Sequence, residues 1–97
     1  MTDQEINAAV AKKLGWKQLG PMKHDPLNVY LEKNGQRIEG IPDYCHSIEA
    51  AWEIVERYQY WVGPDKEKWA VTTVLGIWLA EADTAPMAIC LASLKPV

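Results

Sequence analysis

The stretch Pro42-Asp43-Tyr44-Cys45-His46-Ser47 runs directly into a helical pattern over residues 48–58, and we take this junction as the organising feature of the chain. Ser47 is placed to be an N-cap, because its hydroxyl can accept a hydrogen bond from an amide of the first helical turn. Apolar residues then recur at the spacing of one helix face: Ile48, Ala51, Trp52 and Val55. The sequence therefore predicts a helix that buries this face and leaves its charged side in water.

Before this junction the sequence predicts a helix, a loop and a hairpin. Thr2-Asp3-Gln4-Glu5 forms a capping box, which predicts a helix over about residues 3–14. Residues 17–26 contain one glycine and two prolines without periodicity, and we expect a loop there. Asn34-Gly35 tolerates the positive φ angles of a tight turn, so residues 28–41 are predicted to form a short hairpin. Its imperfect alternation leaves open a sheet edge or an ordered loop.

After the junction the sequence predicts a second hairpin and a last helix. Residues 58–62 and 68–74 are rich in aromatic and β-branched side chains and flank a turn segment at 63–67. Residues 75–80 are either a third strand or an extension of the second after a bulge. Thr84 or Asp83 is expected to cap a helix over 85–94. This helix is almost wholly apolar, so either both its sides are packed or it forms a homodimer contact.

The composition fits one small α+β domain over residues 1–97. A net charge of -3 argues against nucleic acid as the main ligand, because phosphate binding relies on Lys and Arg. The longest apolar stretches are about ten residues, half of the roughly 20 that span a bilayer, so no membrane segment is expected. With no secretory pattern at the N-terminus, the two cysteines are expected to be reduced thiols in a cytoplasm.

Neither a metal site nor an enzymatic constellation is expected. Cys45, His46, His24 and Cys90 are a nominal zinc set, but none of the familiar ligand spacings is present. Cys45 could be a nucleophile beside a histidine, yet no third orienting group is identifiable. Glu81 and Asp83 are explained by the favourable position of negative charge before a helix. We therefore expect no cofactor and no catalytic residue, and a small Cys-dependent hydrolase is the weakest alternative.

The aromatic content favours binding. The chain has five Trp and four Tyr but no Phe, and exposed Trp and Tyr dominate interface hot spots. The leading expectation is a non-catalytic protein-binding module that forms homo-oligomers. The alternative is a small-ligand protein that stacks a nucleotide base on an aromatic ring and holds its phosphate with Lys or Arg. The candidate binding residues are Asp43, Tyr44, His46, Trp61 and Trp69.

Three blocks together give a family resemblance: Leu14-Gly15-Trp16, the junction leading into Ala50-Ala51-Trp52, and residues 81–90. In their order and spacing they resemble the phage ABA sandwich domain of small bacteriophage and prophage proteins, and more faintly the phage NinX proteins. The resemblance implies a three-layer α-β-α sandwich around a small, mainly antiparallel sheet. It also implies a phage or prophage origin, expression in the host cytoplasm and no established activity, and it carries no catalytic residues over. The partner expected for the binding module itself is a host or phage protein.

Overall fold

The computed structural model describes residues 2–21 and 29–95. In these residues the helices are α1 (Asp3–Lys13), α2 (Ile48–Tyr58) and α3 (Ala85–Ser93). The strands are β1 (Lys17–Pro21), β2 (Val29–Lys33), β3 (Gln36–Glu39), β4 (Trp61–Asp65), β5 (Lys68–Thr72) and β6 (Trp78–Ala82). They form two antiparallel sheets in the orders β1-β2-β3 and β4-β5-β6. No helix in the described ranges has the length and apolar character needed to cross a bilayer.

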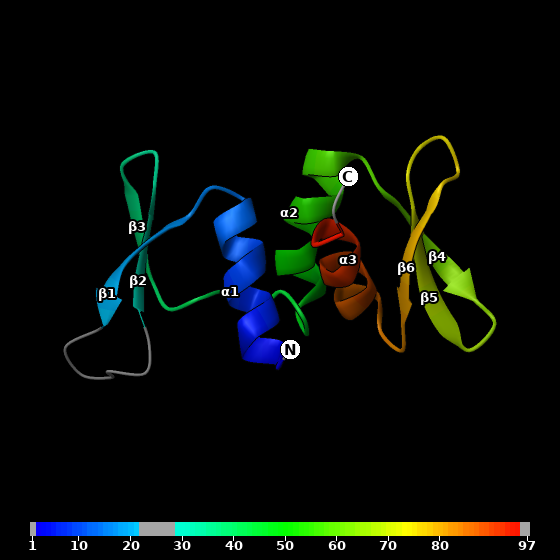
Figure 1. The fold of residues 1–97 in the computed structure, drawn as a ribbon, viewed down its shortest axis with the longest axis horizontal. Helices are drawn as coiled ribbons and strands as arrows, with labels where there is room; N and C mark the ends of the chain where they lie inside the picture. The colour runs from blue at the N-terminus through cyan, green and yellow to red at the C-terminus, as the bar shows by residue number, and fades with distance from the viewer. Residues whose placement is uncertain (1, 22–28, 96–97) are drawn as a thin grey trace.

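The α+β class and the antiparallel strands are as predicted, and the elements are layered as a sandwich. The strands, however, divide into two sheets, which lie at opposite ends of a molecule measuring 44 × 25 × 22 Å, with the helices between them (Figure 1). The apolar character of α3 gives a reason for this order. A helix that is apolar on all sides must be covered on all sides, so it takes the middle of the molecule.

The N-terminal elements confirm the capping box and correct the predicted loop. Thr2 Oγ1 accepts from the Glu5 amide at 3.2 Å, and a Glu5 carboxylate oxygen accepts from the Thr2 amide at 3.3 Å. Residues 17–21 pair with β2 as strand β1, where a loop was expected. A bulge between Gln18 and Gly20 accommodates the irregular sequence that concealed the strand. The rest of the predicted loop lies outside the described residues.

The first hairpin is confirmed. β2 and β3 pair in register around a two-residue turn, at which Asn34 has φ 52° and Gly35 has φ 81°. Positive φ at both central residues is the signature of the turn that best matches strand twist.

Helix α2 begins and ends where predicted, but the expected buried face is wrong in part. Ser47 Oγ accepts from the Ala50 amide at 3.2 Å. Ala51, Ile54 and Val55 are buried, whereas Ile48 and Trp52 are each 46% exposed. The reason is that α2 packs mainly on a single helix, α3, which covers the part of the apolar stripe that contains Ala51, Ile54 and Val55. One edge of the stripe therefore stays in contact with solvent.

The second sheet has a shorter turn than predicted and a third strand. The turn is Lys66-Glu67, with Lys66 at φ 60°, so Gly63 and Pro64 pair within the edge strand β4. For residues 75–80 the sequence left open a third strand or an extension of the second. The structure has a third strand, β6, which begins at Trp78. Thr84 caps α3 by accepting from the Met87 amide at 3.4 Å. α3 packs on α2, β5 and β6, so its apolar surface is covered within the chain and requires no second subunit.

Candidate functional site

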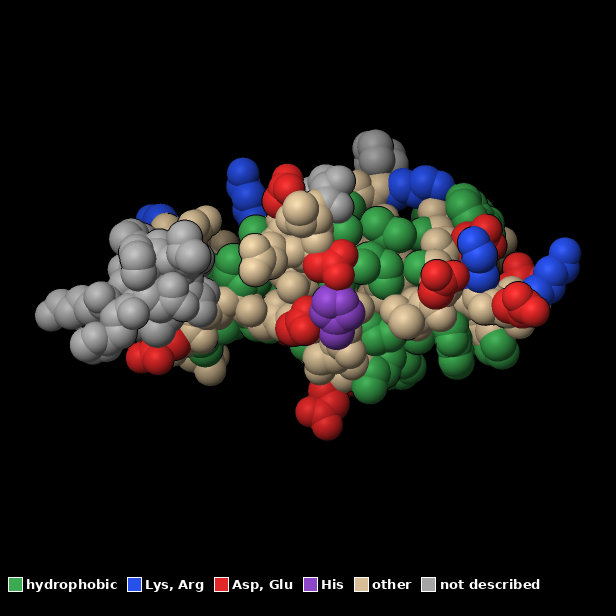
Figure 2. All heavy atoms as spheres, turned by 90° about the horizontal axis from the view of Figure 1, so that it is seen from below, with side chains coloured by type: hydrophobic (Ala, Val, Ile, Leu, Met, Phe, Trp, Pro, Cys, Tyr) green, Lys and Arg blue, Asp and Glu red, His purple; other side chains and the backbone are tan. Residues whose placement is uncertain are grey.

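The junction before α2 carries an exposed network of charged side chains. His46 Nδ1 lies 3.0 Å from both carboxylate oxygens of Asp43, and His46 Nε2 lies 2.9 Å from Asp3 Oδ2. Figure 2 shows the histidine in purple among acidic side chains in red. The hydrogen bond to Asp43 and the attraction of both carboxylates raise the pKa of His46. Both ring nitrogens are engaged, so this histidine links α1 to the junction.

Asn7 of α1 completes this network from the buried side. Its side chain is largely buried; Nδ2 donates to Asp43 Oδ1 at 3.1 Å, and Oδ1 accepts from the Cys45 amide at 2.9 Å. Sequence reasoning missed Asn7, because a single asparagine in an amphipathic helix gives no signal of a contact 36 or 38 residues away. Two of the candidate binding residues, Asp43 and His46, are thus held in structural contacts.

Tyr44 is enclosed in the core, so its expected exposure is wrong. Its side chain is 1% exposed and belongs to the same apolar cluster as Leu14 and Ile54. Burial raises the pKa of Tyr44 to about 12. Tyr44 OH and Trp16 Nε1 are both buried without a hydrogen-bond partner among the described residues. The ring can contact a partner only if the core opens.

Cys45 and Cys90 are both fully buried free thiols. Burial raises the pKa of each thiol. A nucleophilic or metal-binding cysteine needs an accessible thiolate with a lowered pKa, which is the opposite environment. Across residues 2–21 and 29–95, no three His, Cys, Asp or Glu side chains are grouped so as to hold a metal ion.

An apolar groove lies where α2, β4–β5 and the start of α3 meet. It encloses about 550 Å³. Its lining residues are Ile48, Trp52, Val62, Trp69, Asp83, Thr84, Ala85 and Pro86. Trp52 and Trp69 are 46% and 38% exposed, and the remaining side chains are mainly apolar. Two of its lining residues, Ile48 and Trp52, are the α2 side chains that the sequence predicted to be buried. A third, Trp69, is one of the predicted binding residues.

Trp61 and Trp69 do not belong to one site. In the β4–β5 register Trp61 is opposite Thr72, and Trp69 is opposite Pro64. Side chains alternate between the faces of a strand, so these two pairs lie on opposite faces of the sheet. Trp69 faces the groove, whereas Trp61 stands on the outer face and is 68% exposed.

A second hollow of about 500 Å³ lies between α1 and the strands β1 and β2. Trp16 lines it, with Lys12 and Lys17 among the other lining residues. The neighbouring contacts join this end of the molecule to α2. Lys33 Nζ lies 5.6 Å from the Trp16 ring and 3.6 Å from a Glu53 carboxylate oxygen.

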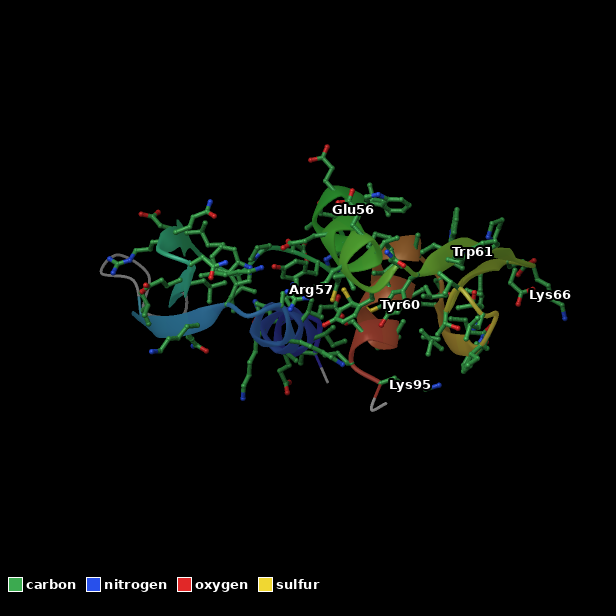
Figure 3. All side chains as sticks on the ribbon, turned by 90° about the horizontal axis from the view of Figure 1, so that it is seen from above. Glu56, Arg57, Tyr60, Trp61, Lys66 and Lys95 are labelled. Atoms are coloured by element: carbon green, nitrogen blue, oxygen red, sulfur yellow. The ribbon has the colours of Figure 1, made fainter. Side chains whose placement is uncertain are left out.

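Arg57 makes a further link between α2 and the end of α1. Its Nη1 donates to the Leu14 carbonyl at 2.9 Å, and Figure 3 shows Arg57 reaching from α2 toward α1.

The comparisons with known proteins agree with the fold and its layering. The family model of the phage ABA sandwich domain matches residues 8–94. Among solved structures, the chain is similar to a phage protein from Bacillus cereus ATCC 14579, with 36% sequence identity and a TM-score of 0.66. This match covers 97% of this chain and 85% of the other. No curated protein matches significantly. With most of its length matched by the family model and by that solved structure, the chain belongs to the phage ABA sandwich domain family, for which no activity is established.

Proposed function

We propose that this protein is a non-catalytic protein-binding module that acts on a host or phage protein in the host cytoplasm. The binding site is the apolar groove beside Trp52 and Trp69. The observation that carries this proposal is that three large apolar side chains, Ile48, Trp52 and Trp69, remain 38–46% exposed around one hollow. Tryptophan is among the residues that contribute most to protein interfaces, and such exposed apolar patches mark interaction sites.

The lining of the groove indicates the chemistry of the partner. Its walls are aromatic and aliphatic, and the one charged lining residue among those described is Asp83. Asp83 is exposed, and no basic side chain of the described residues forms an ion pair with it. A partner segment with a large apolar side chain beside a Lys or Arg therefore complements the groove.

Affinity capture with matched variants tests this function. Trp52→Glu places a charge in the groove, and Leu19→Glu places the same charge at a 39% exposed position in β1, at the other end of the molecule. We expect a stoichiometric partner to be captured by the wild type and by Leu19→Glu and lost with Trp52→Glu. Capture of the same proteins by all three chains, or of no stoichiometric partner by the wild type, contradicts the proposal.

The hollow between α1 and β1–β2 favours a second candidate function, the binding of a nucleotide-type ligand. The Trp16 ring offers a stacking surface, and the Lys12 and Lys17 ammonium groups can pair with a phosphate.

A thermal-shift panel of nucleotides tests this alternative, because a ligand at 100 times its dissociation constant adds about 2.7 kcal/mol of stability. We expect Lys12→Glu to abolish the shift and Lys66→Glu, in the distant β4–β5 turn, to retain it. An absence of any shift with the wild type contradicts the alternative.

A further inference from the structure

The outer face of the β4–β6 sheet carries apolar surface that the groove does not use. Trp61 is opposite Thr72, and Thr72 is opposite Trp78, so the three side chains form one row across the sheet. Between β5 and β6 the register skips Leu79, because Val71 pairs with Ala80 and Thr72 pairs with Trp78. Such a bulge re-aims a side chain. It leaves Trp78 on the same outer face as Trp61, across the central strand from it, and the two are 51% and 68% exposed.

The β5–β6 connection follows Thr72, at the end of the sheet that carries Trp61 and Trp78, and it adds three exposed aliphatic side chains. Val74, Leu75 and Ile77 are 55%, 85% and 59% exposed. The connection is held by its own hydrogen bonds: Thr73 Oγ1 accepts from the Ile77 amide at 3.1 Å, and the Thr73 carbonyl accepts from the Gly76 amide at 2.9 Å. An apolar surface already held in one shape loses little entropy when it binds.

A trough of about 320 Å³ lies on this face, with Trp61 and Trp78 among its lining residues. Its floor is low because the side chains along it are small: the central strand contributes Ala70 and Thr72. The space over Gly63 is open, since a Cβ added there meets no atom within 4 Å. The two tryptophans are two strand spacings apart, about 10 Å, which admits one further aromatic ring. The face therefore presents both a projecting indole and a slot for an indole.

We propose that this outer face is a homodimer interface, in which Trp61 of each copy lies over Thr72 of the other, between its two tryptophans. A two-fold axis requires such a self-complementary patch. The Lys95 ammonium lies 4.4 Å from the Trp78 ring centroid, a cation–π contact that helps to hold this ring in place. Charged residues lie at the opposite end of the sheet, around the turn at Lys66 (Figure 3), where they form a polar rim.

The exposed apolar area is sufficient for a specific dimer. The two tryptophans and three aliphatic side chains present on the order of 500 Å² per copy, when a whole aromatic side chain is given about 150–250 Å². Two copies bury about 1,000 Å², the lower limit for a specific interface.

Sedimentation velocity over a concentration series tests the homodimer. We expect a wild-type dimer, and at least about a 30-fold rise in its dissociation constant with Trp61→Glu and with Leu75→Asp, as for hot-spot residues. Trp52→Glu, a groove variant, should dimerise as the wild type does, so this test is separate from the capture experiment. Leu75 is 85% exposed in the monomer, which makes Leu75→Asp informative even if Trp61→Glu fails to fold. A monomeric wild type, or a dimer that persists in both variants, overturns the proposal.

Discussion

At the scale of single residues, the junction before α2 is a structural joint. Asn7 bridges the Asp43 side chain and the Cys45 amide, while His46 lies between Asp3 and Asp43. These contacts use the polar groups that the sequence offered as candidate binding or catalytic residues. The neighbouring side chains of Tyr44 and Cys45 are buried in the core. The conspicuous chemistry of this stretch is therefore explained by its attachment to α1.

The His46 contacts predict how stability changes with pH. The pKa of His46 is raised in the folded protein by hydrogen bonding and attraction to Asp43, with Asp3 adding to it. Its contribution is thus fully present below the unfolded value of about 6.5 and is lost as pH rises through the folded pKa. Thermal melts at pH values from below about 6.5 to above the folded pKa of His46 test this role. The melting temperature of the wild type relative to that of His46→Gln should decrease as pH rises. Parallel pH profiles for the two proteins are incompatible with this role.

At the scale of elements, the sequence identified all three helices in the described residues, because caps act over three or four residues. Thr2, Ser47 and Thr84 each accept a hydrogen bond from an amide three positions later. The orientation of α2 was harder to predict. The spacing of apolar residues shows which helix face is apolar, but not how much of that face the neighbouring element covers. α3 covers the part with Ala51 and Ile54, and the edge with Ile48 and Trp52 becomes one wall of the groove.

Two isoleucines on α2 provide a matched test of this orientation. Ile54 is 0% exposed and Ile48 is 46% exposed, and truncation to alanine removes the same atoms from both. Ile54→Ala should lower the free energy of unfolding by about 2–5 kcal/mol, the usual cost of a fully buried isoleucine. Ile48→Ala should cost less than half as much, as measured by urea denaturation. Equal losses at the two positions mean that the orientation of α2 is wrong.

At the scale of the whole molecule, the two sheets and their separation could not be predicted from the sequence. Hairpin signals such as Asn34-Gly35 specify which strands are neighbours, but not whether two hairpins join in one sheet. Strand β1 was missed because a bulge replaces regular alternation there. The predicted binding residues Trp61 and Trp69 lie on opposite faces because the β4–β5 turn is shorter than expected.

This arrangement gathers the exposed tryptophans in the half of the molecule that contains α2 and the β4–β6 sheet. Trp52 and Trp69 line the groove, and Trp61 and Trp78 lie on the outer face of the β4–β6 sheet. Figure 2 shows hydrophobic side chains in green over the middle of the molecule and this half, with charged side chains at its tip. Because the groove and the outer face lie on opposite sides of the sheet, a dimer formed through one leaves the other open to a partner. The two proposed interactions are therefore compatible.

Site-specific photo-cross-linking in the phage-bearing host tests the groove most directly. A photoreactive phenylalanine at position 52 or 69 keeps an aromatic ring in the groove, and the same residue at exposed Glu39 in β3 serves as the control at the far end of the molecule. We predict one common protein adduct from positions 52 and 69 and none from position 39. Adducts that are the same from all three positions, or absent from both groove positions, would contradict the assignment of the groove as the protein-binding site.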